Sequence, residues 1–578
     1  MRKFSILVVA AVAANACRTA GGTAVPGAAP AAGGGRAAFD YVITNGRIVD
    51  GTGAAWFRGD IGIRGDRIAR MAPRGTLVSA PAAQRIDAND LIVAPGFIDI
   101  QAQSYGNFMN GDGLGLSMVT QGITTAILGE GSTPAPISQR DLAEITDPAE
   151  RTRATVLSGP RGFGNWLESM RARGMSQNVG SFVGAGTVRV YGKGRAMGAP
   201  SSVELDSMRL MMRNAMEDGA FGVASALIYP PNNYASTGEL VEIVRAMAPY
   251  GGVYITHMRS EGDQFLEALD EAIRIGREGG VPVEVYHLKA SGPRNWPKMP
   301  RAIAKIDSAR AAGQDVQADM YLYIAGGNNF SSCIAPKYAA DGKLLDNLRD
   351  AALRPQIKRD LMADDAGYEN LCVIAGPGNV MVVGFRRPEL KQHEGKRLDE
   401  IARAMGKDWG DVIIDLNIAE NGQLGELLFL MSEENVKLQL RQPWIKFGTD
   451  AGAMDPARAT GLTHPRAYGN FPRLLGKYVR DERVIPLEDA VRKASAAVAT
   501  RLSLNDRGVL KEGMKADIVV FDEKTIRDLA TFESPHQLSV GMRHVLVNGV
   551  PVVRDGEHTG AKPGQLVRGT GWTGTPRE

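Results

Sequence analysis

Two short stretches, GGVYITHMR (251–259) and VPVEVYHLK (281–289), indicate how the chain folds. Each is an apolar run with period-two alternation, and each reaches a histidine just before a polar segment. Between them, DQFLEALDEAIRIGREGG (263–280) has apolar residues at three- and four-residue spacing and ends in two glycines, which is typical of a helix. The order strand, helix, strand predicts a parallel β/α unit.

The same alternation continues on both sides of these stretches. TTAILGE (124–130) is a further strand pattern, which ends in a carboxylate where the others reach a histidine. SSVELDSMRLMMRNAMEDG (201–219) is a further helical pattern. We therefore expect residues 94–502 to form one TIM-type (β/α)8 barrel of the α/β class, with its functional side chains at the C-terminal ends of the strands. The rhythm is interrupted from about 326 to 430, which predicts an inserted subdomain.

Both ends of the chain are rich in β signals. YVITNGRIVDGTG (41–53) and MRHVLVNGVPVVRDGEHTG (542–560) each carry β-branched residues around an Asn-Gly turn. Strand-rich ends that flank one long α/β segment are expected to pair with each other. We therefore predict a small composite β-sandwich built from residues 39–93 and 503–570.

The first forty residues have the pattern of an export signal. A basic start, an apolar stretch at 4–14 and an Ala-Asn-Ala motif predict a signal peptide over 1–16. The following Gly/Ala/Pro-rich residues, 17–38, read as a tether. We expect an exported protein, periplasmic or held at the envelope, and the sequence leaves open whether Cys17 carries a lipid anchor.

Composition narrows the classes of partner. The chain has 44% hydrophobic and 23% charged residues with a formal net charge of +3, and it has no long Lys/Arg run. This composition is typical of a globular protein and argues against a nucleic-acid partner. Besides Cys17 only Cys333 and Cys372 occur, and they could form a disulfide or remain two separate buried thiols.

Candidate metal ligands stand at three strand ends: Glu130, His257 and His287. If each strand keeps its alternation, each of these side chains shares a face with the apolar residue two positions earlier, and all three point into the barrel. Imidazole and carboxylate groups suit zinc. The alternatives are two hydrogen-bonded histidines and a helix-capping glutamate.

Asp450 closes another strand-like run, WIKFGTDAG (444–452). A carboxylate beside a metal site is suited to act as a general base toward water. We therefore name Asp450 as the candidate catalytic residue. The competing interpretation is that it caps a following helix.

Longer motifs resemble those of the D-aminoacylase (N-acyl-D-amino-acid deacylase) branch of the amidohydrolase superfamily. The resemblance covers residues 39 to 570 and implies a TIM barrel with a composite β-sandwich, an inserted subdomain and zinc-dependent hydrolysis of a non-peptide C–N (amide) bond. The motifs that carry it include FDYVITNGRIVDGTG (39–53), VTQGITTAILGEG (119–131), YITHMRSEG (254–262), GTDAGA (448–453) and THPRAYGNFPRLLGKYVR (463–480).

The chain departs from that family at the first barrel strand. The His-x-His motif of the superfamily is Gln101-Ala102-Gln103 here, and a further family histidine corresponds to Ala185. The resemblance assigns a tightly held zinc to Glu130, His257 and His287, and the His-x-His pair to a second, weaker metal position. Glutamine is a poor zinc ligand. We therefore expect one zinc ion, with Gln101 and Gln103 lining the pocket where second-metal ligands are missing.

The resemblance also implies residues that contact the substrate. Lys289 and Arg466 correspond to groups that hold a substrate carboxylate, although each could instead belong to a structural ion pair within the protein. Tyr229 and Tyr321 correspond to tyrosines near the substrate or its oxyanion. A catalytic role of His464 is left open.

These residues predict an enzyme that hydrolyses N-acyl amino acids, with the D form favoured by the resemblance. Its partner is then a small molecule that carries a carboxylate. Cyclic amides, ureides or D-containing dipeptides are alternative substrates on the same scaffold. A different alternative is a non-catalytic envelope binding protein on a decayed barrel. The oligomeric state is left open.

Overall fold

The computed structural model describes residues 38–364 and 367–574. The expected signal peptide, and the expected tether apart from its last residue, lie outside the described residues. Among the described residues, no helix combines the length and the apolar character that crossing a membrane requires.

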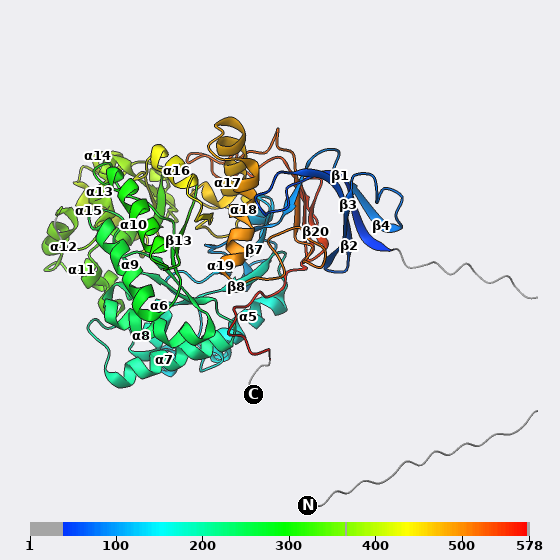
Figure 1. Ribbon diagram of the computed structural model, residues 1–578. Helices are drawn as coiled ribbons and strands as arrows, with labels where there is room; N and C mark the ends of the chain where they lie inside the picture. Colours follow the sequence, from blue (N-terminus) through cyan, green and yellow to red (C-terminus); the bar gives the residue numbers. More distant parts are fainter. Residues whose placement is uncertain (1–37, 365–366, 575–578) are drawn as a thin grey trace, which may run out of the picture. The chain divides into compact units, whose positions relative to one another are not determined.

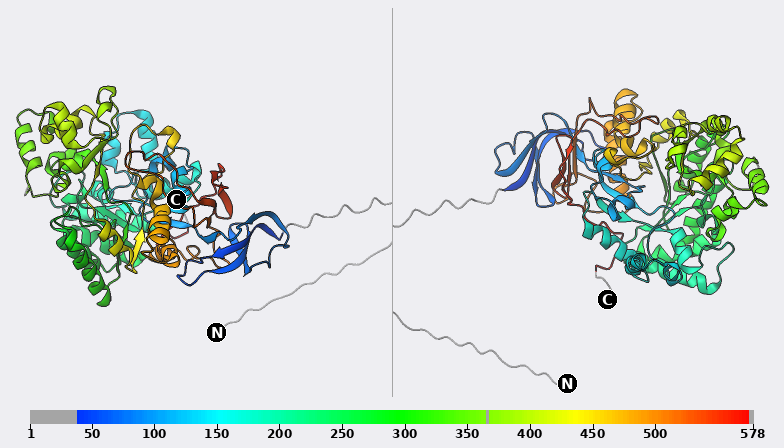
Figure 2. Two further views of the ribbon diagram at one scale, coloured as in Figure 1. Left: turned by 90° about the horizontal axis from the view of Figure 1, so that it is seen from above. Right: turned by 180° about the vertical axis from the view of Figure 1, so that it is seen from behind.

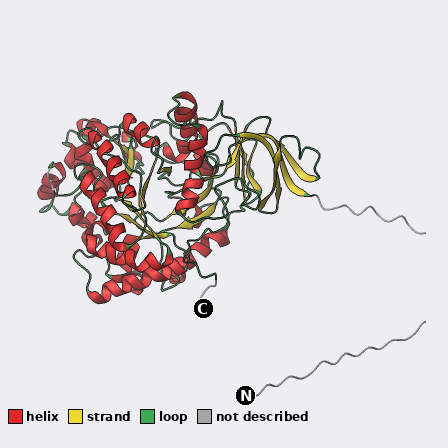
Figure 3. Ribbon diagram, viewed as in Figure 1, coloured by secondary structure: helices red, strands yellow, loops and turns green. Residues whose placement is uncertain are grey.

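Eight parallel strands form the centre of the described chain, and helices surround them (Figure 3). The strands follow one another in sequence order around a ring, and one of them is interrupted only at Phe182, between β8 and β9. The predicted (β/α)8 barrel is thus confirmed. Its strands are β6 (Phe97–Asp99), β7 (Ile123–Leu128), β8 (Asn178–Ser181) with β9 (Val183–Gly184), β10 (Gly222–Ala226), β11 (Val253–His257), β12 (Val283–Val285), β13 (Val316–Met320) and β17 (Ile445–Phe447).

The ring closes just beyond the first and last strands. Ala102 pairs with Ala451 in a parallel bridge, and the Asp450 N–H donates to the Gln101 carbonyl oxygen at 2.8 Å. The buried Asp99 carboxylate joins the same two segments, accepting from the Thr449 N–H at 2.9 Å and from the Gln101 N–H at 3.1 Å. Burial raises the pKa of Asp99 to about 6 in spite of these hydrogen bonds. The closure therefore holds Gln101 and Asp450 next to each other.

The helices of the barrel begin and end where the sequence signals predict. The longest has a capping box in which Ser201 and Glu204 satisfy each other's backbone N–H groups. The helix between the two histidine strands ends at Gly280, whose φ of +73° suits glycine. The helices include α5 (Gly162–Arg173), α6 (Ala185–Gly192), α7 (Ser202–Glu217), α8 (Thr237–Met247), α9 (Phe265–Gly279), α10 (Met299–Ala311), α16 (Glu433–Leu440), α17 (Arg466–Arg473), α18 (Leu487–Ala494) and α19 (Ala496–Arg501).

Strands from both ends of the chain form one nine-stranded sheet (Figure 1). The N- and C-terminal strands join where β5 and β18 pair antiparallel, and Figure 2 shows the blue and red strands side by side in both views. The predicted pairing of the two ends is therefore present. The strands are β1 (Phe39–Ile48), β2 (Phe57–Arg64), β3 (Arg67–Pro73), β4 (Ala82–Asp87), β5 (Ile92–Pro95), β18 (Ile518–Phe521), β19 (Met542–Val547), β20 (Val550–Arg554) and β21 (Glu557–His558).

The segment expected as an insert, about 326–430, has a sheet and an apolar cluster of its own. Cys333 and Cys372 form a disulfide inside this cluster, which decides between the two alternatives left by the sequence. The elements are β14 (Gly326–Asn329), α11 (Leu344–Arg349), α12 (Arg354–Met362), α13 (Leu371–Ala375), β15 (Val380–Val383), α14 (Leu398–Met405), α15 (Trp409–Ala419) and β16 (Gly425–Leu428).

The predicted strand alternation is wrong for Glu130 and His287. On β7, Ile127 packs inside the barrel while Leu128 packs against the helices, and on β12 Val285 also faces the helices. Both polar residues still reach the pocket, because the backbone turns just before or at them. Gly129 has φ of +120° and His287 has φ of +33°. Only His257, two residues after the interior Ile255, follows the expected pattern.

Gly129→Ala should destabilise the protein. An added Cβ would lie 2.3 Å from the Phe182 carbonyl oxygen, a backbone atom that cannot rotate away, and φ of +120° is unfavourable for alanine. We expect the free energy of unfolding to fall by about 2 kcal/mol or more and the thermal midpoint to drop. Gly106→Ala is the matched control, because its Cβ would meet nothing within 4 Å. Equal midpoints for the two variants would contradict this account of the turn.

Candidate active site

A cavity of about 730 Å³ opens at the C-terminal ends of the barrel strands. The insert forms its other wall through residues of β14 and β16, including Asn328 and Leu427. Among the predicted site residues, only Gln101 does not line this cavity, and it contacts Glu130 instead. Those that do are Gln103, Glu130, Tyr229, His257, His287, Lys289, Tyr321, Asp450 and Arg466.

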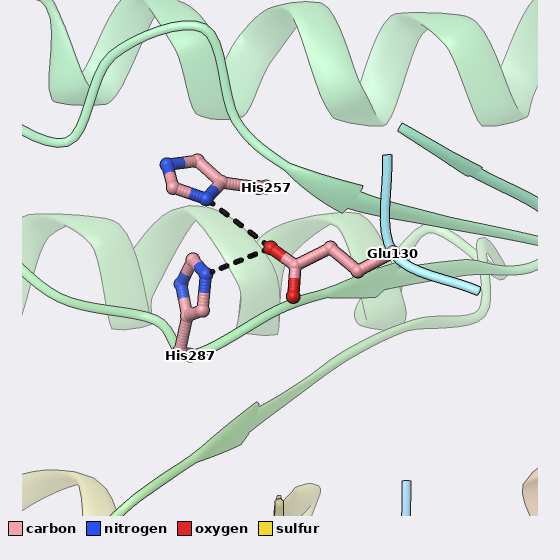
Figure 4. Close-up of side chains that lie close together, drawn as sticks. All are labelled: Glu130, His257 and His287. Carbon is pink, nitrogen blue, oxygen red and sulfur yellow. Dashed lines mark hydrogen bonds and ion pairs between the residues drawn. The ribbon is translucent and has the colours of Figure 1, made fainter. Parts of the chain in front are cut away.

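Glu130, His257 and His287 converge on one point from three strand ends (Figure 4). Glu130 Oε1 lies 3.3 Å from His257 Nδ1 and 3.3 Å from His287 Nε2. Hydrogen bonds between charged groups are usually shorter, about 2.7–2.9 Å. Tetrahedral zinc bonds of about 2.0 Å place neighbouring ligand atoms about 3.3 Å apart. The spacing and the donor types therefore fit a zinc ion better than they fit a hydrogen-bonded cluster.

The charges around these groups favour a positive charge next to Glu130. Burial and Lys289 oppose a charge on His287, but Glu261 and Glu130 outweigh them and hold the pKa of this ring well above its usual value. Burial opposes ionisation of Glu130, but its contacts with the two histidines outweigh burial and hold the pKa of the carboxyl well below its usual value. Burial lowers the pKa of His257, so this imidazole favours its neutral, metal-binding form. The Glu130 carboxylate is thus ionised and accessible to a positive charge.

Behind His287 stands a buried carboxylate, Glu261. Its Oε1 lies 3.0 Å from His287 Nδ1 and 2.7 Å from Lys289 Nζ, and Lys289 Nζ also lies 2.7 Å from that ring nitrogen. Burial disfavours the charge on Glu261, but Lys289 and the histidines more than compensate and lower its pKa. A carboxylate on the outer nitrogen of a metal-binding histidine orients the ring and raises its basicity.

Asp450 lines the same cavity as the ligand group and is paired with Arg466. Arg466 Nη1 is 2.8 Å from Asp450 Oδ2. Burial raises the pKa of Asp450, and Arg466 opposes this rise. Asp450 has φ of +48° and begins no helix, so the capping alternative is excluded.

Arg466 is held in place by two aromatic side chains. Its guanidinium group lies 4.4 Å from the centre of the Tyr321 ring. His464 Nδ1 accepts from the Arg466 backbone N–H at 3.0 Å, and His464 Nε2 donates to the Ala325 carbonyl oxygen at 2.8 Å. Both nitrogens of His464 are therefore engaged with the backbone next to Arg466, which argues against the catalytic role left open for it.

Tyr229 connects the barrel to the insert. Its hydroxyl donates to Asn328 Oδ1 at 2.5 Å, and its ring meets the His257 ring edge-on with centroids 5.3 Å apart. The hydroxyl therefore lies at the boundary between the candidate metal ligands and the insert wall.

Comparison with known proteins assigns the chain to a family. The protein-family model described as "Amidohydrolase family" matches residues 420–553. The D-aminoacylase of Alcaligenes xylosoxydans xylosoxydans is 33% identical over 92% of this chain and 98% of its own length. The chain belongs to the D-aminoacylase branch of the amidohydrolases. It is therefore a metal-dependent hydrolase that acts on amide bonds.

Solved structures of this branch are similar to the chain over most of its length. A D-aminoacylase structure, concerned with a binuclear metal centre, one-metal activation and second-metal attenuation, has a TM-score of 0.74 at 32% identity and covers 92% of this chain and 100% of its own. The N-acyl-D-glutamate deacylase of Bordetella bronchiseptica, solved with zinc and a phosphonate mimic of the tetrahedral intermediate, has a TM-score of 0.73 at 30% identity over 92% of this chain and 99% of its own.

Two residues of this D-aminoacylase-like site were missed from the sequence. Glu261 follows His257 by four residues, and its position in the loop after a ligand strand was the available signal. Glu369 belongs to the insert and accepts from the backbone N–H groups of Glu261, at 2.8 Å, and Gly262, at 3.1 Å. Nothing in the sequence around Glu369 indicated this contact, because 108 residues separate it from Glu261.

Lys289 has a partner within the protein that the sequence did not reveal. The prediction that it holds a substrate carboxylate stays a prediction, since it lines the cavity. Its contact with Glu261 gives it a further role, which is to support the carboxylate behind His287.

Glu261→Gln should weaken metal binding in this D-aminoacylase-like site. The substitution removes the negative charge next to His287 Nδ1. Changes to such outer partners of metal-binding histidines typically cost about 10–100-fold in metal affinity. Zinc affinity measured by competition with a chelator checks this. Glu267→Gln, at an exposed position on α9, is the control and should leave the affinity unchanged. An unchanged affinity in Glu261→Gln would show that His287 needs no such partner.

Proposed function

We propose that this enzyme hydrolyses N-acyl-D-amino acids with a single bound zinc ion. One observation carries the proposal: a three-ligand group suited to zinc shares a cavity with the Asp450–Arg466 pair. The relatives that act on N-acyl-D-amino acids by their names support the substrate class. The missing second-metal ligands at Gln101 and Gln103 support a single ion.

The residues on the page suit the two proton transfers of amide hydrolysis. Zinc, when bound by Glu130, His257 and His287, would activate water and stabilise the negative charge that develops on the acyl oxygen. Asp450 accepts the proton of the attacking water and returns it to the departing amine as the C–N bond breaks. Arg466 binds the carboxylate of the amino acid, while Tyr229 stands close to the reacting carbonyl.

The insert wall favours an apolar amino-acid side chain. Among the described residues, Lys289 and Arg466 are the only lysine and arginine that line the cavity, and each is paired with a carboxylate. Arg466 is assigned to the carboxylate of the amino acid and Lys289 is held by Glu261, so among the described residues no further lysine or arginine lines the cavity for a second substrate carboxylate. The apolar part of the lining includes Leu371, Val383, Leu427, Met454 and Leu462.

We also propose that the enzyme acts outside the cytoplasm. The basic start, the apolar stretch at 4–14 and the Ala-Asn-Ala motif support this location. Lipid attachment at Cys17 would hold it at the envelope, and the Gly/Ala/Pro-rich residues that follow would serve as a tether.

A substrate panel tests the function. We expect kcat/KM to be highest for N-acetyl-D-leucine and lower for N-acetyl-L-leucine, N-acetyl-D-glutamate, a D-containing dipeptide and a hydantoin. Elemental analysis should find one zinc per chain. Preference for the hydantoin or the dipeptide would favour those alternative substrates. A metal-free protein without activity would favour the binding-protein alternative.

Asp450→Asn should abolish turnover while zinc stays bound. Asparagine cannot accept the proton, and loss of a general base costs about 10²–10⁴-fold in rate. Zinc content and kcat for N-acetyl-D-leucine are the two measurements. Asp206→Asn, on the exposed face of α7 with a side chain 72% exposed, is the control. Full activity in Asp450→Asn would remove the proposed base.

Arg466→Met should change both substrate binding and the pH profile. Loss of a hydrogen bond between charged groups should raise KM about tenfold or more. Arg466 opposes the rise in the pKa of Asp450, so its removal raises that pKa further. Because the base must be ionised, the variant would lose activity at a higher pH than the wild-type enzyme when the pH is lowered. Arg466→Lys should shift the acid limb of kcat/KM less, and an unmoved limb in Arg466→Met would contradict the pairing.

A further inference from the structure

Gln101 and Gln103 both contact Glu130, on the oxygen that does not face the histidines. Gln101 Nε2 donates to Glu130 Oε2 at 2.7 Å, and Gln103 Nε2 donates to the same oxygen at 2.7 Å. Both distances fall in the short range of hydrogen bonds to charged groups. We call these two side chains the amide pair.

The chemistry of the groups fixes the orientation of the amide pair. An ionised carboxylate only accepts hydrogen bonds, so each amide must present its N–H side to Glu130 and turn its oxygen away. The Gln101 Oε1 atom is buried and has no hydrogen-bond partner among the described residues. Neither glutamine can offer its oxygen to a metal next to Glu130 Oε2 without breaking its bond to the carboxylate.

The backbone of residues 101–103 fixes the position of the amide pair. The Ala102 N–H donates to the Ile127 carbonyl oxygen at 2.9 Å, and the Gln103 N–H donates to the Ala451 carbonyl oxygen at 3.0 Å. These bonds attach the segment to β7 on one side and to the segment after β17 on the other. The two amides are therefore held by the closure of the barrel itself.

The two oxygens of Glu130 consequently have different partners. Oε2 accepts two N–H groups, while Oε1 faces His257 and His287 at 3.3 Å each. The carboxylate can offer one oxygen to a metal, and the N–H groups place partial positive charge on the side where a second cation would otherwise approach.

We propose that the amide pair positions Glu130 as a one-oxygen metal ligand and restricts the site to a single ion. Gln101 and Gln103 are positioning residues in this proposal, since they act through Glu130. The proposal rests on the proposed zinc site. It goes beyond the absence of second-metal ligands, because it gives the glutamines a role of their own.

Gln103→Met tests the positioning role. Gln103 is the less buried member of the pair, and methionine keeps its length without the N–H donors. We expect zinc to bind about 10–100-fold more weakly, as for other outer partners of ligands, with one equivalent bound at saturation. Gln392→Met, at an exposed position of the insert, is the matched control. Wild-type affinity in Gln103→Met would overturn the positioning role.

The double variant Gln101→His/Gln103→His tests the restriction to one ion. It replaces two N–H donors with imidazoles, which have lone pairs for a metal. We expect zinc stoichiometry at saturation to rise from one to two equivalents, and the visible spectrum of the cobalt-loaded protein to change. One equivalent in a folded double variant would overturn this part of the proposal. If the double variant does not fold, Gln103→His with the same titration takes its place.

The outcomes separate this proposal from the proposed function. Hydrolysis of N-acetyl-D-leucine by the wild-type protein tests the function, whereas zinc affinity and stoichiometry test the amide pair. A wild-type protein that binds one zinc but cleaves no member of the substrate panel would contradict the proposed function. The role of the amide pair would then still be tested by the zinc affinity and stoichiometry of its variants. A wild-type protein that binds two zinc ions at saturation would overturn the amide pair and the single-ion part of the proposed function, while the substrate class would still be decided by the panel.

Discussion

The site depends on the contacts that the Glu130 carboxylate makes with four other side chains. One oxygen faces two histidines from neighbouring strands, and the other accepts from two glutamines of the first strand. The carboxylate reaches this position because Gly129 adopts φ of +120°, which turns the chain into the cavity at the end of β7. The first, second, fifth and sixth strands of the barrel thus meet at one side chain.

Around that carboxylate the cavity gathers charged groups of both signs. Four carboxyl groups line it with one lysine and one arginine: Glu130, Glu261, Glu426 and Asp450 with Lys289 and Arg466. Lys289 and Arg466 each have a carboxylate partner, whereas Glu130 has the two neutral amides and the histidines. In spite of burial, Glu261 and Glu130 hold the pKa of His287 well above its usual value, so a positive charge next to Glu130 is favourable. A metal at this place would supply that charge, and the ligand spacing suits it.

Much of this arrangement could be predicted from the sequence, and the failures have local physical causes. Strand and helix periodicity predicted the barrel, and polar residues at strand ends predicted Glu130, His257 and His287. The predicted faces failed where the backbone leaves the regular strand, at Gly129 and at His287 itself. Periodicity assumes an unbroken strand, so it cannot report a change of direction at the last residue, which is where catalytic side chains stand.

The insert was the part that the sequence described least, and a chain of contacts joins it to the candidate metal ligands. Glu369 accepts from the backbone of the loop that carries Glu261, Glu261 contacts His287, and His287 faces Glu130. Each contact fixes the next side chain, so the wall that would receive the substrate side chain and the group that would hold the metal form one connected structure. A change in the insert is therefore expected to alter metal binding as well as substrate preference, because the two share their supporting residues.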